Sequence, residues 1–287
     1  MAGSIRAFAM NEWRRFARHR LALVGLGVIV TLSLLALAAR QVAPHDPIQQ
    51  DLPRALAKPS AEFPLGTDQF GRCILSRIVF GARQSLLVGV IATAIGASAG
   101  ILLGLVAGYF PRLDGPVMRT MDVLLAFPSI LLAIAVVAAL GPSLGNVMIA
   151  VGVRSIPSFA RVSRSMVLSL KELDFVRGAL ALGASHSRVL FRHILPNSVS
   201  PLLVFSSMQV ATAILLAAIL SFLGLGVQPP TPEWGKMVSD GRAYLMEAPH
   251  LSLFPGLAIF VAVMGFNCLG DGLRDALDPR VGRVAVD

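Results

Sequence analysis

Long uncharged, apolar stretches limit what this chain can fold into more than any other feature of its sequence. A helix needs about 20 apolar residues to cross roughly 30 Å of hydrocarbon, and several runs between charged residues reach that length. Of the 287 residues, 55% are hydrophobic and 14% are charged, whereas soluble domains contain about a quarter charged residues. The composition excludes a water-soluble enzyme with a polar surface and predicts an all-α integral membrane protein.

Charged and helix-breaking residues divide the apolar sequence into six predicted transmembrane helices. The uncharged run after Asp122 is too long for one crossing, and Gly141 and Pro142 interrupt it, so we assign two spans there. The predicted spans are residues 21–39, 85–110, 123–140, 144–160, 198–222 and 251–270. The main segments beside them are residues 1–20, 40–84, 161–197, 223–250 and 271–287.

The basic residues predict the orientation of these spans. Six spans place both termini on one side, and a cytoplasmic N-terminus puts 17 of the 25 Lys and Arg residues on the inner side and 8 on the outer side. This is the asymmetry of the positive-inside rule. We therefore assign the net charge of +9 to contact with the lipid bilayer, and we expect cytoplasmic termini and no nucleic-acid partner.

A cleaved signal peptide is the competing interpretation of the N-terminus. Ala36, Leu37 and Ala38 resemble a cleavage site that follows a basic region. The uncharged run over residues 21–39 is longer than the roughly 7–15 residues usual for the apolar part of a signal peptide. We therefore expect the first span to be retained.

The predicted spans lack the charged residues of an ion-coupled carrier. Arg154, in the fourth span, is the only charged residue within their limits, whereas ion-coupled carriers usually need such groups near the midplane. Energy for transport must then come from elsewhere.

Pro128 and Pro157 permit kinks in the third and fourth spans. Some polar residues could line a pathway or bond neighbouring helices: Asn146, Ser206, Ser207, Gln209, Thr212 and Asn267.

Small residues recur every four positions in the second predicted span. They line one helix face with Ala92, Gly96, Gly100, Gly104 and Gly108. Small side chains let a neighbouring backbone approach closely, which is how helices associate in lipid. We interpret this face as a packing surface within the chain, with a subunit contact as the alternative.

The predicted cytoplasmic segment 161–197 is unusually long for a membrane carrier. Leu173, Val176 and Leu180 recur at helical spacing and predict a short helix that Gly183 ends.

A second short helix, residues 186–195, is expected to place Arg188 and Arg192 one turn apart. Pro196 is expected to end its hydrogen-bond ladder before the fifth span. The same pattern would also suit an interfacial segment whose arginines meet anionic lipid.

This segment resembles the EAA loop, the cytoplasmic signature of permease subunits in ATP-binding-cassette (ABC) importers. The matching positions are Ala179, Gly183, Leu195 and Pro196. The family has Glu and Ala where this chain has Arg177 and Gly178, and Ile where it has His193, so the role of Arg177 stays open. The resemblance implies contact with an ATPase subunit through Arg177, Gly178, Ala179, Gly183, Arg188, Arg192, Leu195 and Pro196.

Three further stretches resemble the C-type permease of the dipeptide and oligopeptide importers. They are residues 63–77, with Phe-Pro-Leu-Gly-Thr-Asp at their start, residues 221–235, and residues 269–280. Within the second stretch, Gly224 and Gly226 are expected to unwind the end of the fifth span, and Trp234 to sit in the interfacial belt. Cys73 stands where the family has an acidic residue, and we assign it no role.

The resemblance implies a type I importer permease with six spans in the bacterial cytoplasmic (inner) membrane. It would pair with a homologous permease, two cytoplasmic ATPase subunits and an extracytoplasmic solute-binding protein, and import di- or oligopeptides. The chain has no GxxxxGK[ST] motif, so ATP and Mg²⁺ would bind to the partner ATPases and this chain would hold no cofactor and no metal.

Import of nickel or glutathione is the alternative within the family. The five histidines are His19, His45, His186, His193 and His250, and they show no metal-ligand spacing.

Function classes outside this family are less well supported. A self-sufficient channel or secondary carrier is disfavoured by the uncharged spans and the long cytoplasmic segment. An intramembrane enzyme is disfavoured because the chain lacks paired carboxylates, HExxH and GxSxG.

Cys73 and Cys268 are too few for a disulfide framework or a four-cysteine zinc site, so we expect them to serve packing.

Overall fold

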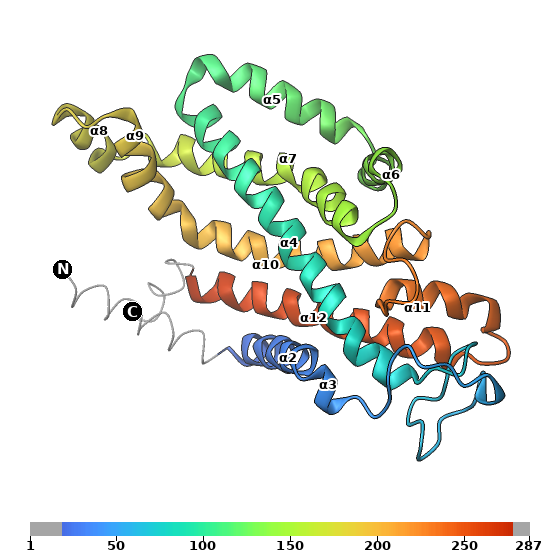
Figure 1. The fold of residues 1–287 in the computed structure, drawn as a ribbon. Coiled ribbons are helices and arrows are strands. Elements are labelled where there is room, and N and C mark those ends of the chain that lie inside the picture. Colours follow the sequence, from blue (N-terminus) through green and yellow to red (C-terminus); the bar gives the residue numbers. More distant parts are fainter. Residues whose placement is uncertain (1–18, 278–287) are drawn as a thin grey trace.

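The computed structural model describes residues 19–277, and the named elements in this range are all helical (Figure 1). The all-α prediction is therefore confirmed. The predicted N-terminal segment up to residue 18 and the tail from residue 278, with the last part of the 269–280 stretch, lie outside the described residues. The elements are α2 Arg20–Leu37, α3 Ala39–Val42, η1 Leu52–Arg54, α4 Ile74–Tyr109, α5 Pro111–Ala126, α6 Ser129–Leu140, α7 Leu144–Leu170, α8 Asp174–Ala181, α9 His186–Arg188, η2 Val189–Ile194, α10 Leu195–Phe222, α11 Trp234–Gly241, η3 Arg242–Tyr244 and α12 His250–Leu277.

Four of the described helices are long and apolar enough to cross a membrane. They are α2, α4, the continuous helix His186–Phe222 and α12, and the bent pair of α5 and α6 makes a fifth if it counts as one span. Helix α7 is not among them, although it packs along the second half of α4. The structure thus supports four to five spans by length and composition, and the count of six stays a prediction.

The predicted span 123–140 is two helices in the structure. Helices α5 and α6 meet at 93°, and Phe127 between them is extended, with φ −81° and ψ 136°. Pro128 explains the break, because a proline disfavours helical geometry in the residue before it and has no N–H to donate. The proline that we expected to permit a kink separates two helices instead.

The prediction that Pro196 ends a helix is wrong. The helix runs without a break from His186 to Phe222, with a π-helical turn at Val189–Ile194 just before the proline. In this turn the Leu195 N–H bonds to the Leu190 carbonyl, so Pro196 falls in the first turn of α10. A proline inside a helix lacks the ladder N–H and its ring crowds the carbonyl four residues earlier, and the wider π-helical turn offers room for it.

The two ends of the bundle carry different structures (Figure 1). Helices α2 and α12 pack so closely that a Cβ on Gly272 would lie 2.1 Å from the Ala22 Cβ, and His19 Nε2 lies 2.9 Å from Asp275 Oδ2. The start of α2 and the end of α12 therefore lie together, and Figure 1 places them at the same end of the bundle as α8 and α9, which we call the α8 end. Helix α11 and the segment 43–73 lie at the opposite end, the α11 end.

Helix α4 connects these two ends. Its 36 residues correspond to about 54 Å at 1.5 Å per residue, which exceeds the roughly 30 Å of hydrocarbon in a bilayer. The helix begins at Ile74, eleven residues before the predicted second span. The extra turns carry Arg77 and Arg83 and form the base of the α11 end.

Candidate functional site

The bend between α8 and α9 is a helix C-cap built on a glycine. Gly183 has a φ of +81°, the left-handed conformation that glycine adopts without steric cost. Its N–H bonds to the Leu180 carbonyl at 2.9 Å, and the Ala184 N–H bonds to the Ala179 carbonyl at 3.0 Å. These two bonds form a Schellman motif, and Ser185 then caps α9 by accepting a hydrogen bond from the Arg188 N–H.

One residue of the predicted apolar stripe holds α8 against the bundle. The Val176 side chain is 0% exposed and packs with Leu105 of α4 and Val167 of α7. The same cluster contains residues of the π-helical turn, namely Val189, Leu190 and Ile194. The other two stripe residues, Leu173 and Leu180, are exposed.

The outward surface of α8 combines apolar and basic side chains. Phe175 and Leu182 are exposed, Leu182 at 91%, although they lie outside the apolar spans. Arg177 pairs with Glu172 at 2.5 Å on this exposed surface. Exposed apolar side chains that cluster beside charged ones are typical of a protein interaction site. The other predicted contact residues exposed at this end are Gly178, Gly183, Arg188, Arg192 and Pro196.

The segment between α7 and α10 is attached to the end of α4 on both sides of α8. Before α8, Lys171 Nζ donates a hydrogen bond to the Gly108 carbonyl at 3.2 Å. After α8, the Tyr109 hydroxyl lies 2.8 Å from His186 Nδ1, and Phe110 meets the same imidazole edge-on. Sequence reasoning missed these contacts because the partners are 63 and 77 residues apart.

The small-residue face of α4 lies against α7 of the same chain. A Cβ added to Gly96 would lie 2.6 Å from the Ser155 Cβ. A Cβ added to Gly100 would lie 2.5 Å from the Ile156 carbonyl oxygen, and one added to Gly104 would lie 2.3 Å from the Ala160 carbonyl oxygen. A Cβ added to Gly108 would lie 2.7 Å from the Val167 Cβ. Helix α7 therefore covers this face along its whole length.

A buried ionic cluster organises the α11 end. Asp68 accepts hydrogen bonds from the Arg72 N–H at 3.0 Å and from Arg72 Nε at 2.7 Å, and Arg77 Nε lies 3.5 Å away. Arg72 is 4% exposed and Arg77 3%. Because buried charges need partners, this single carboxylate ties the segment 43–73 to the start of α4. We assigned these residues no role from the sequence, because Asp68 and Arg72 lie in a turn outside any helix, where their spacing alone does not predict a pair.

Glu233 and Trp234 anchor α11 on α4. The Glu233 carboxylate caps α11 by accepting hydrogen bonds from the N–H groups of Gly235 and Lys236, each at 2.9 Å. Burial raises the pKa of this carboxyl, and the two N–H groups oppose that shift. The expectation that Trp234 lies in an interfacial belt is wrong, because its ring is 0% exposed and its Nε1–H bonds to the Ile78 carbonyl at 2.9 Å.

Two smaller expectations concern glycine and cysteine. Gly224 follows α10 with a φ of +84°, and the Leu225 N–H bonds back to the Leu220 carbonyl at 2.9 Å, so the helix ends there as expected.

Cys73 is buried and Cys268 is partly buried, and both are free thiols. Among residues 19–277, no three His, Cys, Asp or Glu side chains are grouped to hold a metal ion.

Comparison with known families decides what kind of protein this is. Residues 100–283, which include α5 to α12, match the family described as the binding-protein-dependent transport system inner membrane component. Residues 11–59 match the N-terminal TM domain of oligopeptide transport permease C. The chain belongs to this permease family.

Curated relatives and solved structures agree with the family. The permease is 48% identical to the dipeptide transport system permease protein DppC of Alkalihalophilus pseudofirmus, over 95% of this chain and 91% of the relative. It is 51% identical to the glutathione transport system permease protein GsiD of Escherichia coli, over 94% of this chain and 89% of the relative. The fold resembles a chain of the MetNI methionine ABC transporter, with a TM-score of 0.57 and 17% identity over 70% of this chain and 97% of that one.

Proposed function

We propose that this permease is a membrane subunit of an ATP-driven importer of dipeptides or short oligopeptides in the bacterial cytoplasmic membrane. Its partners would be a homologous permease, two cytoplasmic ATPase subunits that bind ATP and Mg²⁺, and an extracytoplasmic solute-binding protein. The α8 end would face the cytoplasm and the α11 end the outside. The six predicted spans belong to this proposal, with the break at Pro128 inside the third.

The observation that carries the proposal is the way the α8–α9 segment is held. Its exposed face offers Phe175, Leu182 and basic side chains to a partner, while Val176 and His186 join it to α4. A partner that moves this segment therefore also moves α4, whose other end supports the α11 end. ATP-driven closure of the ATPase subunits would shift the permease between inward-open and outward-open states, because ATP binding favours one of them.

Glutathione is a second candidate substrate. The GsiD relatives from Escherichia coli and Pectobacterium atrosepticum, at 51% and 47% identity, are glutathione permeases by name, and glutathione is itself a tripeptide. The permease would then perform the same mechanical role for a different cargo. Nickel is the weaker alternative, because no relative compared above transports it by name.

The decisive experiment measures ATPase activity in nanodiscs that contain the permease co-expressed with its genomic neighbours. The candidate binding protein is added empty, or loaded with di-, tri- and longer peptides or with glutathione. We expect peptide-loaded protein to stimulate ATP hydrolysis most, and the most effective cargo identifies the substrate. A permease that purifies folded without an ATPase bound would contradict the proposal and favour a channel or carrier.

A further inference from the structure

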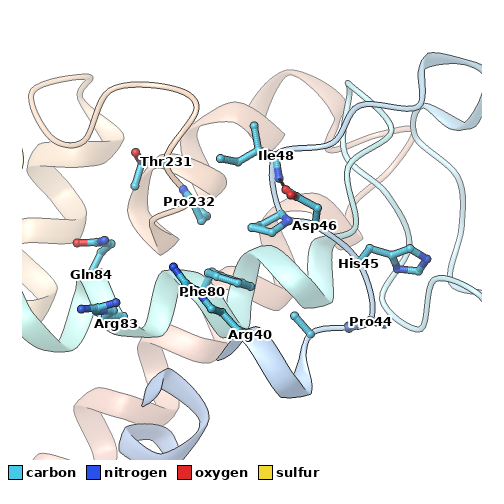
Figure 2. Close-up of a pocket in the computed structure, with 12 residues that line it drawn as sticks. Arg40, Pro44, His45, Asp46, Ile48, Phe80, Arg83, Gln84, Thr231 and Pro232 are labelled. Carbon is cyan, nitrogen blue, oxygen red and sulfur yellow. Dashed lines mark hydrogen bonds between the residues drawn. The ribbon is translucent and has the colours of Figure 1, made fainter. Parts of the chain in front are cut away.

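The α11 end contains a pocket of about 580 Å³ (Figure 2), within the range of small-molecule sites. Three segments that are distant in sequence form it. Arg40 lies in α3 and residues 43–48 follow that helix, residues 80–84 belong to α4, and residues 231–232 precede α11. A hollow between such segments is a product of the tertiary structure.

Two guanidinium groups line one side of this pocket. Arg40 and Arg83 are both exposed, and within residues 19–277 neither forms an ion pair with an acidic side chain. Figure 2 shows both side chains on the side of the pocket nearer Gln84, below Thr231 and Pro232. Arginine presents a planar set of donors that matches a carboxylate, so this side suits an anionic group.

The rest of the lining suits the remainder of a short peptide. Asp46 lies toward the other side in Figure 2. Its Oδ1 accepts a hydrogen bond from the Ile48 N–H at 2.7 Å, and its carboxylate could also meet an ammonium group. The apolar part of the lining comes from Phe80, Ala43, Ile48 and the prolines Pro44, Pro47 and Pro232. The side chains of these residues offer no hydrogen-bonding groups, so this part of the lining would not select one peptide side chain over another by polar contacts.

Buried contacts hold two walls of the pocket in place. In residues 40–48, the His45 N–H bonds to Ser76 Oγ at 3.0 Å, and the Pro47 carbonyl accepts from Arg77 Nη1 at 3.0 Å. The His45 ring stacks on Phe63 with centroids 4.6 Å apart and points away from the pocket in Figure 2. On the opposite wall, Glu233 fixes the chain directly after Pro232. Walls held in this way need not be ordered when a ligand binds, which lowers the cost of binding.

We propose that this pocket receives a short peptide on its way into the permease, with the C-terminal carboxylate on Arg40 and Arg83 and the ammonium group on the Asp46 side. The proposal rests on the proposed function and names the part of the permease that first holds the cargo. Because these contacts are made to groups that all free peptides share, the pocket would accept peptides that differ in their side chains.

The test uses the full importer in proteoliposomes and the double variant Arg40→Gln with Arg83→Gln. Uptake of trialanine is measured while the concentration of loaded binding protein is varied. We expect the maximal uptake rate to fall roughly tenfold, the effect of losing about 1.4 kcal/mol of charge-assisted hydrogen bonding, with the half-saturating concentration of binding protein unchanged. Lys58→Gln, an equally exposed charge at the same end but outside the pocket, is the matched control and should leave both values unchanged.

A second readout examines binding without the solute-binding protein. Saturation-transfer NMR on the importer in nanodiscs should detect trialanine, and the signal should weaken both for trialanine amide and in the double variant. Co-purification of the ATPase subunits verifies that the variant is assembled. The variant Arg40→Lys with Arg83→Lys keeps the charges but loses the bidentate hydrogen-bonding geometry of arginine. Its saturation-transfer signal should be intermediate between those of the wild type and the glutamine double variant.

Other outcomes separate the competing explanations. A raised half-saturating concentration at an unchanged maximal rate would overturn the proposal and make the arginines a docking point for the binding protein. A defect seen in vesicles with phosphatidylglycerol but absent in pure phosphatidylcholine would assign them to lipid headgroups. Normal uptake by the double variant would refute only the pocket, whereas failure of the wild-type importer to take up any peptide would refute the proposed function itself.

Discussion

Among single residues, Gly183 has the most clearly defined physical role. Nothing lies within 4 Å of a Cβ placed there, so only its positive φ opposes a side chain. We expect Gly183→Ala to destabilise the α8–α9 bend by about 1 kcal/mol and to speed hydrogen exchange over residues 173–186 in the isolated permease. Gly178→Ala is the control, because Gly178 has equal space within helix α8 and alanine favours a helix. Equal exchange in the two variants would contradict this account.

Gly104 is constrained by space instead. A Cβ there would lie 2.3 Å from the Ala160 carbonyl oxygen, so Gly104→Ala must push α4 and α7 apart. We expect a loss of about 1–3 kcal/mol, measured as a lower melting temperature of the purified permease. Gly115→Ala in α5, where nothing lies within 4 Å, should leave the melting temperature the same or raise it. If Gly104→Ala melts like Gly115→Ala, the close approach of the two helices is wrong.

Glu233 should make the stability of the α11 end depend on pH. Because burial raises its pKa in the folded state, the folded protein binds this proton more tightly than the unfolded chain does. Its contribution to stability is therefore greatest at low pH and falls as pH rises from the usual glutamate range through the folded pKa. We expect the difference in melting temperature between the wild type and Glu233→Gln to change with pH in this direction. A difference that is constant between pH 4 and 8 would count against the buried carboxyl.

Among the elements, α4 matters most because both candidate sites are built on it. Tyr109 at one end contacts His186, and Phe80 and Arg83 at the other line the pocket. We expect Tyr109→Phe to lower peptide uptake per ATP hydrolysed roughly two- to fivefold, since a hydrogen bond of about 1 kcal/mol is lost, while basal ATP hydrolysis is retained. Tyr244→Phe changes the other tyrosine of the chain, which lies at the α11 end, and serves as the control. Unchanged coupling in Tyr109→Phe would exclude this contact as part of the transmission.

In the whole molecule, the 36-residue helix α4 runs from the α11 end to the α8 end, so these ends lie at opposite extremes of the bundle (Figure 1). We expect single cysteines at Ser187 and Lys58, in a variant without the two native cysteines, to react with a membrane-impermeant maleimide from opposite sides. Sealed right-side-out vesicles should label Lys58→Cys, and Ser187→Cys should label only after the vesicles are opened. Labelling of both positions in sealed vesicles would contradict the proposed orientation.

The sequence alone determined the features that depend on neighbours along the chain. Apolar content determined the helical membrane class, and the need for a left-handed residue determined the bend at Gly183. The spacing of four marked the small-residue face of α4. Each of these follows from the chemistry of a few adjacent residues, so no tertiary contact is needed to infer it.

Only the tertiary structure decided which groups are buried and which segments meet. Pro196 continues a helix because a π-helical turn precedes it, and Trp234 is buried because α11 lies on α4. The Glu233 carboxylate has Ser85, 148 residues earlier, within 3.4 Å. The pocket at the α11 end is likewise formed by three segments that are distant in sequence. Such contacts depend on the energies of packing and desolvation between distant parts of the chain, which local sequence patterns do not encode.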